Sequence, residues 1–307
     1  MGQPRSQLPS LWRRRDLLRL LPAAAAFFLV GGIGLGRGIG DLPPDPASRQ
    51  AGASLHFLAI ADSGSGNANQ RAVADRMAEV HEREPVDLVL MGGDNIYPDG
   101  NLRRVKKTFS DPYRVLLESK VPFHAVLGNH DIRTANGTPQ VGYAPFGMEG
   151  RWYSLRRGPV EFFMLDTNVN ADWRRQMPWL TKALAASVAP WKVVVGHHPL
   201  YSAGHYGDDK LAIRRLTPLF QKYGVQLYIN GHEHNYERTQ SIDGTTYLTV
   251  GGAGAWLRPV RPNGRTAKAV STYSFAELHA SRDELTIQAW DFKGKSIDRA
   301  VLRRRPA

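Results

Sequence analysis

Five short polar motifs, each following an apolar run, narrow the possible folds of this chain more than any other feature. They are Asp62, Gly-Asp-Asn-Ile-Tyr at 93–97, Gly-Asn-His-Asp at 128–131, Gly-His-His-Pro at 196–199 and Gly-His-Glu-His at 231–234. With residue types at roughly one in twenty each, a fixed four-residue string is expected by chance in only about 0.002 of chains this long. The motifs carry carboxylate, amide, phenol and imidazole groups, enough ligands for two metal ions.

Short β-rich runs alternate with helical stretches from residue 54 onward, which is typical of an α/β fold. Strands are predicted at 55–61, 87–91, 123–127, 160–165, 192–195 and 226–229, and helices at 69–83, 101–109, 173–187 and 209–223. The later segments 239–250, 273–280, 285–291 and 296–302 are predicted to form antiparallel strands joined by turns such as Asp243-Gly244 and Lys293-Gly294. We expect a two-layer β-sandwich flanked by helices. The motifs should converge, because ligands bind beyond the carboxyl ends of strands.

The first forty residues have the layout of an export signal. Arg14 and Arg15 precede seventeen uncharged residues at 20–36, and the paired arginines resemble the twin-arginine type of signal. That uncharged stretch is marginal for a membrane span, so a retained membrane anchor is the alternative. We therefore expect interaction with an export machinery and a periplasmic or extracellular location. The predicted organisation is a signal or anchor at 1–40, a Pro-rich linker at 41–53 and one domain at 54–307.

Composition excludes some classes of site. The chain of 307 residues has no cysteine, so disulfides and thiolate metal sites are impossible. The formal charge of +12 falls to +7 without residues 1–40, from 34 basic and 27 acidic residues, and the remaining charge is scattered. Specific nucleic-acid binding is therefore not expected, whereas a basic surface attracts anionic phosphate esters.

The residue types suggest different roles within the motifs. Asp94 follows two glycines that let the backbone approach a charged centre closely, and a single carboxylate there can bridge two ions. His130 can stay off the metal and face the substrate. His232 and His234 are two residues apart, so on an extended segment they would point to the same side, holding one ion together or one each.

The order and content of the motifs resemble the calcineurin-like metallophosphoesterases over roughly residues 55–300. Within these, the Gly-Asp-x-x-Tyr pattern is most similar to the small single-domain purple acid phosphatases of the tartrate-resistant type. The resemblance implies Fe(III) held by Asp62, Tyr97 and His234, a divalent ion (Fe, Zn or Mn) held by Asn129, His197 and His232, and Asp94 bridging them. It also implies that His130 faces the substrate. His205, eight residues after His197, is matched with a second such histidine that small members place nine residues on.

The implied activity is hydrolysis of phosphate monoesters by attack of metal-bound hydroxide, in an exported enzyme. Two cations outweigh the negative ligands by about one charge, so a phosphate dianion is attracted. A phosphodiesterase or nuclease on the same centre is one alternative, and a non-catalytic phosphate-binding module is another. The histidines outside the motifs are expected at ordinary core or surface positions, namely His56, His81, His124 and His279.

Overall fold

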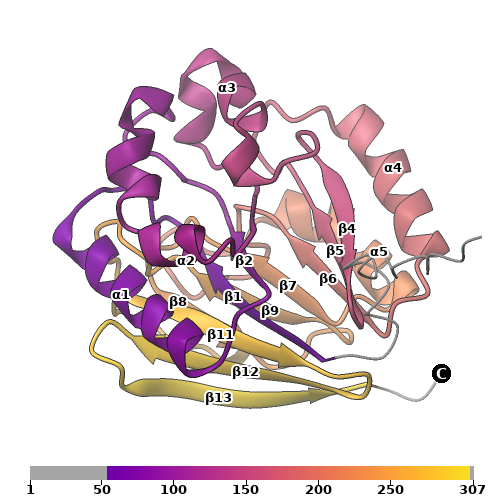
Figure 1. Ribbon diagram of the computed structural model, residues 1–307. Coiled ribbons are helices and arrows are strands. Elements are labelled where there is room, and N and C mark those ends of the chain that lie inside the picture. The colour runs from indigo at the N-terminus through magenta and orange to yellow at the C-terminus, as the bar shows by residue number, and fades with distance from the viewer. Residues whose placement is uncertain (1–53, 305–307) are drawn as a thin grey trace, which may run out of the picture. The chain divides into compact units, whose positions relative to one another are not determined.

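The computed structural model describes residues 54–304, which form two β-sheets packed face to face with helices on both outer sides (Figure 1). The first sheet has the order β13-β12-β11-β1-β2-β3 and the second β10-β8-β9-β7-β6-β5-β4. The strands of the first sheet are β1 Leu55–Ile60, β2 Leu88–Met91, β3 Phe123–Ala125, β11 Ser274–Ala280, β12 Glu284–Asp291 and β13 Ser296–Arg303. Those of the second are β4 Tyr153–Arg157, β5 Val160–Met164, β6 Trp191–Val195, β7 Leu227–Asn230, β8 Tyr236–Thr239, β9 Thr246–Val250 and β10 Thr266–Val270.

The five α-helices of residues 54–304 lie in the connections between strands; all but the third join parallel strands, and the third lies where the chain passes from the first sheet to the second. They are α1 Ala68–Arg83, α2 Arg114–Glu118, α3 Thr138–Val141, α4 Trp173–Ala186 and α5 Lys210–Tyr223. Asn67 caps the start of helix α1, where its side chain accepts a hydrogen bond from the Gln70 amide. The helix ends at Arg83, before Glu84 and Pro85, because proline disfavours helix in the residue preceding it. Among residues 54–304, no helix combines the length and the apolar character that crossing a membrane requires.

Strand alternation distributes the apolar side chains among three cores. Phe57 and Ala59 of β1 face the second sheet and belong to the core between the two sheets. Leu58 and Ile60 face the other way and pack with helix α1, as the period of two in a strand requires. A third core joins the second sheet to α4 and α5. The layers therefore run helix, sheet, sheet, helix.

The six earlier predicted strands agree with β1, β2, β3, β5, β6 and β7 within two residues at each end, and the segments at 273–280, 285–291 and 296–302 form β11 to β13. The single segment predicted at 239–250 contains β9 but only the last residue of β8. Strands β4 and β10 were not predicted. The helical segment expected at 101–109 is present, but it is not an α-helix: a short 3-10 turn at 102–104 is followed by a π-helix at 106–110. The expected signal or anchor at 1–40 and linker at 41–53 lie outside the described residues.

Candidate metal centre

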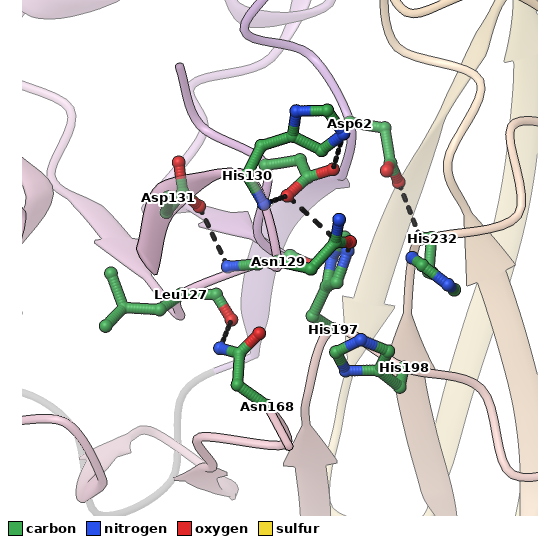
Figure 2. Close-up of polar contacts among 12 residues, drawn as sticks. Asp62, Leu127, Asn129, His130, Asp131, Asn168, His197, His198 and His232 are labelled. Atoms are coloured by element: carbon green, nitrogen blue, oxygen red, sulfur yellow. Dashed lines mark hydrogen bonds and ion pairs between the residues drawn. The ribbon is translucent and has the colours of Figure 1, made fainter. Parts of the chain in front are cut away.

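The polar motifs follow the carboxyl ends of parallel strands, where the backbone turns sharply. Asp62 follows β1 and Asp94 follows β2, with φ of 56° and 54°, and His232 has φ of 67°. Such left-handed conformations cost non-glycine residues about 1–3 kcal/mol each, and they persist where surrounding contacts hold them. Here Asp62 Oδ2 accepts from the His232 amide at 2.8 Å (Figure 2), and Asp94 Oδ1 accepts from the His130 amide at 2.8 Å.

Glycines in the motifs let these loops approach each other. A Cβ atom on Gly128 would lie 2.2 Å from Asp94 Oδ1, and one on Gly231 would lie 2.3 Å from Asp62 Oδ2. Real Cβ atoms essentially never come this close to a neighbouring atom. Any larger residue would therefore push the carboxylates out of place, which explains why a glycine begins these motifs.

The first group of donors comprises Asp62, Tyr97 and His234. The Tyr97 hydroxyl donates to Asp62 Oδ1 at 3.1 Å and lies 3.3 Å from His234 Nε2. His234 Nε2 is 3.4 Å from the same Asp62 oxygen. His234 Nδ1 donates to the Trp256 carbonyl at 2.6 Å, so Nε2 is the nitrogen that faces the centre.

The second group comprises Asn129, His197 and His232. His197 Nε2 lies 3.1 Å from Asn129 Oδ1, while its Nδ1 donates to the Gly92 carbonyl at 2.9 Å. The rings of His197 and His232 have centroids 5.1 Å apart. Asp94 connects the two groups, since one ligand atom each of Asp62, Asp94 and His197 lie within 4.8 Å of one another. The structure thus brings all seven predicted ligands together.

The expectation that His232 and His234 point to the same side is wrong. It assumed an extended segment, but the positive φ of His232 turns the chain between them. His234 consequently faces Tyr97 and Asp62, whereas the His232 ring lies against His197 and His198. Each histidine therefore serves a different donor group.

The two predicted substrate-facing histidines lie in different surroundings. His130 is partly exposed, packs against Tyr97 with ring centroids 4.5 Å apart, and places Nε2 at 3.9 Å from Asp94 Oδ2. His205 is exposed, and its ring contact among the described residues is with Tyr206. The prediction for His205 therefore needs correction. Tyr206, nine residues after His197, is the side chain that this loop brings to the centre, stacking on His232 with centroids 4.2 Å apart.

Charge and burial act strongly on the donors. Burial alone would raise the pKa of Asp62, but the hydrogen bond from His234 and the charges of nearby histidines bring it down to about 2. Burial, together with the charges of His197 and His198, lowers the pKa of His232 to about 2. Burial and then the charges of Asp62 and Asp94 raise the pKa of Tyr97 well above its ordinary value. The imidazole of His232 is thus neutral and available as a ligand.

Three supporting residues gave no clear sequence signal of their role. Asp131 is fully buried and accepts from the amides of Gly128 at 2.8 Å and Asn95 at 3.1 Å, so it ties two motif loops together. Thr167 Oγ1 accepts from the amides of both His197 and His198. His198 has Nδ1 at 2.9 Å from that hydroxyl, and its ring packs against His232. The only sequence signal for Asp131 was its place as the last residue of the Gly-Asn-His-Asp motif at 128–131.

The donor set fits metal cations. Asp62 and Asp94 are buried, and among residues 54–304 their ion-pair partners are histidines, with no lysine or arginine within 4.0 Å. Two buried carboxylates without a fixed cation are costly unless positive charge is supplied. Oxygen and imidazole donors of this kind suit Fe, Zn and Mn. Two ions, sharing Asp94, would be held by the two donor groups.

Comparisons with known proteins agree with this geometry. A sequence model of the calcineurin-like phosphoesterase family matches residues 55–236. Purple acid phosphatase 7 of Arabidopsis thaliana is 32% identical over 299 residues, covering 85% of this chain and 90% of that protein. Tartrate-resistant acid phosphatase type 5 of Mus musculus is 30% identical over 303 residues, covering 82% and 91%.

Solved structures share the fold. Purple acid phosphatase PPD1 from yellow lupin (Lupinus luteus) seeds has a TM-score of 0.73 at 21% identity, covering 82% of this chain and 54% of that one. GAP50, the anchor in the inner membrane complex of Plasmodium, has a TM-score of 0.72 at 23% identity, covering 82% and 90%. The family match and the relatives at 30% identity or more show that this chain belongs to the calcineurin-like phosphoesterase family, as a metal-dependent phosphoric ester hydrolase similar to the purple acid phosphatases.

Proposed function

We propose that this hydrolase cleaves phosphate monoesters at a centre of two metal ions, Fe(III) and a divalent ion of Fe, Zn or Mn. The main support is the division of the seven donors into two groups around Asp94. Apart from the shared Asp94, the donors that can carry a negative charge are Asp62 and Tyr97, and they lie together with His234. The neutral donors Asn129, His197 and His232 form the other group. An unequal division of charge suits ions of unequal charge.

Tyr97 supports the trivalent assignment. Its hydroxyl lies beside the carboxylates of Asp62 and Asp94, which together with burial raise the pKa of Tyr97 well above its ordinary value. The phenol therefore ionises only next to a strong positive charge. A hard trivalent ion supplies that charge and would form a coloured complex with the phenolate.

His130 is positioned to exchange a proton with the ester. When bound, the two ions would activate a water molecule and offset the charge of the phosphoryl oxygens. His130 Nδ1 donates to the Pro98 carbonyl at 2.6 Å, so Nε2 is the nitrogen that can exchange a proton. It accepts from Arg133 Nη2 at 3.2 Å. That nitrogen, 3.9 Å from Asp94 Oδ2, is suited to protonate the leaving oxygen as a general acid.

The test compares a monoester with its diester on protein purified with its metals. We expect two ions per chain by mass spectrometry of the metals, and a higher kcat/KM for 4-nitrophenyl phosphate than for bis(4-nitrophenyl) phosphate. A higher kcat/KM for the diester would favour a phosphodiesterase or nuclease instead. Unchanged turnover after complete removal of the metals would refute a metal-dependent reaction.

A non-catalytic phosphate-binding module is the alternative of another class. Fold alone permits it, since GAP50 shares the fold and is described as an anchor. This chain, however, keeps all seven donors and the partly exposed His130 beside them. A module that only binds phosphate has no need of a general acid, so hydrolysis is the better explanation of this set.

We also propose that the enzyme is exported. The support is in the sequence, where paired arginines at 14 and 15 precede an uncharged stretch at 20–36. Replacing both arginines by lysine should retain the enzyme in the cytoplasm of the cell that makes it. Cell fractionation and the N-terminal mass of the exported form measure this, and unchanged export of the variant would contradict the twin-arginine route.

A further inference from the structure

The loop between β6 and α5 is fixed against the metal centre by two glutamates. Glu233 lies between the two histidines of the 231–234 motif, and its Oε1 accepts from the Tyr206 amide at 2.5 Å. Glu237 Oε2 accepts from the Ala203 amide at 2.8 Å. A Cβ atom on Gly204 would lie 2.5 Å from the Glu233 carboxyl carbon, so a larger residue there would displace this carboxylate. These contacts turn Tyr206 inward and leave its neighbour His205 in solvent.

Tyr206 lies at the open side of the second donor group. Its ring stacks on His232 with an interplanar angle of 18° and a centroid distance of 4.2 Å. The side chain is half exposed, and its hydroxyl has no hydrogen-bond partner among the residues that the structure describes. The phenol is therefore held by its ring and keeps a free donor for a ligand that arrives at the centre.

Arg258 completes this side of the centre. Its amide donates to the His234 carbonyl at 2.9 Å, and its Nη1 donates to the His232 carbonyl at 3.0 Å. The guanidinium carbon lies 4.8 Å from the centre of the Tyr206 ring. No carboxylate between residues 54 and 304 lies within 4.0 Å of this guanidinium, so a positive charge beside the metal ligands is left without a counter-charge.

The neighbouring acidic residues do not neutralise Arg258. A pocket of about 260 Å³ next to Tyr206 and His232 is also lined by Asp208 and Asp209. Asp208 accepts from both terminal nitrogens of Arg265, at 2.8 and 2.7 Å. Asp209 Oδ1 accepts two amides at the start of α5. Both carboxylates are therefore already engaged, and neither pairs with Arg258.

We propose that Tyr206 and Arg258, rather than His205, contact the oxygens of the phosphoryl group that is transferred. This inference rests on the proposed phosphatase function and adds two substrate-contacting residues to it. Arg258 would form charge-assisted hydrogen bonds to the phosphoryl dianion, and the Tyr206 hydroxyl would donate a further one. Because inorganic phosphate has the same oxygens but no leaving group, its binding isolates this contact.

The experiment measures the Kd of inorganic phosphate by calorimetry on metal-loaded protein, with metal content determined in parallel. Arg258→Gln should weaken phosphate binding about 10- to 100-fold, and Tyr206→Phe about 3- to 10-fold. Arg265→Gln is the matched control, since that arginine is already paired with Asp208, and His205→Ala tests the rival residue. In both variants the Kd of phosphate should stay within about twofold of its value in the unchanged protein.

Phosphate binding that is unchanged in Arg258→Gln with two ions retained would overturn the proposal, as would an equal loss in His205→Ala. Reaction with phenylglyoxal gives a second readout without substitution. Phosphate should protect Arg258 from this arginine reagent, and modification at the same rate with and without phosphate would also overturn it. Neither measurement needs turnover, so failure of the phosphatase activity on monoesters would be seen separately.

Discussion

Strand β1 has a cluster of histidines and carboxylates at each of its ends. Beyond its carboxyl end lies the metal centre with Asp62. At its amino end, His56 stacks on His279 across the β1–β11 pair, with ring centroids 4.0 Å apart. One ligand atom each of His56, Glu84 and His279 lie within 4.8 Å of one another, so residue types and spacing alone would make both ends candidate metal sites.

The charges around the carboxylates distinguish the two ends. Glu277, buried between the histidines, lies 3.2 Å from His56 Nε2 and 3.5 Å from Arg83 Nη2, and it accepts from Trp290 Nε1 at 2.5 Å. The protein itself thus supplies the donors and the positive charge that this carboxylate needs. At the metal centre neither Asp62 nor Asp94 is paired with a lysine or arginine among the described residues. The positive charge that these carboxylates need therefore has to come from bound ions. A metal site is therefore indicated by buried carboxylates that lack a fixed cation.

The largest expected effect is on metal content, which should change after a substitution at the carboxyl end of β1 but not after the matched one at its amino end. Asp94→Asn should remove the shared carboxylate and lower kcat by more than the about 10- to 100-fold that loss of an outer-sphere partner costs. The number of bound ions should fall below two. Glu277→Gln is the matched change at the other end and should keep both ions and normal turnover. Loss of metal in Glu277→Gln would show that the comparison is wrong.

His130→Ala should lower kcat by about 10²- to 10⁴-fold, the usual contribution of a general acid. Metal content should stay at two ions, because His130 Nε2 lies 3.9 Å from Asp94 Oδ2 and the amide that donates to Asp94 Oδ1 remains in the variant. Kinetics and metal analysis on the same preparation measure both. If the variant loses an ion, His130 is a ligand and its role as a proton donor is refuted.

Tyr97→Phe tests the colour of the iron-loaded protein. A phenolate bound to Fe(III) gives a visible charge-transfer band, and removal of the hydroxyl should abolish it while Asp62 and His234 remain in place. Absorption spectra before and after the substitution measure this. A colourless parent protein that nevertheless turns over would remove the ferric assignment.

The smallest expected effect is on stability at the amino end of β1. Glu277→Gln should lower the free energy of unfolding by about 1–3 kcal/mol, because Arg83 and His279 lose a hydrogen-bonded charge partner. Denaturant unfolding of metal-loaded protein measures it. Arg303→Gln, which removes an exposed ion pair with Glu284, is the control and should change stability by less than about 1 kcal/mol.

The difference in free energy of unfolding between the parent protein and the Glu277→Gln variant should depend on pH. Burial alone would raise the pKa of Glu277, but hydrogen bonds from His279, His56 and Trp290 bring it well below its ordinary value. Its stabilisation is therefore present above the unfolded pKa of about 4.3 and is lost as pH falls. The bond to Glu277 raises the pKa of His279, so that contribution is present below about pH 6.5 and is lost as pH rises. The difference between the two proteins should be largest from about pH 4.5 to 6.5, and a flat profile would contradict it.

Local patterns predicted most of the framework. The strand before Asp62 has apolar residues on both faces because each face packs against a core. It therefore reads as a nearly continuous apolar run, which can be recognised in the sequence. The segment at 101–109 is helical, as predicted, but its pattern did not distinguish the 3-10 turn and π-helix found there from an α-helix. Strand β10, which was not predicted, has no fully buried residue. Exposure alone does not explain this, because β13 also has no fully buried residue and was predicted.

The sequence by itself determined the donors of the metal centre, because glycines and polar residues placed after apolar strands must meet at one edge of a parallel sheet. Only the tertiary structure decided which direction each loop side chain takes. The Glu233 carboxylate fixes Tyr206 rather than His205 against the centre, and the positive φ of His232 sends the paired histidines apart. These outcomes depend on contacts between segments distant in the chain, and a shift of one residue in a loop reverses which side chain faces inward.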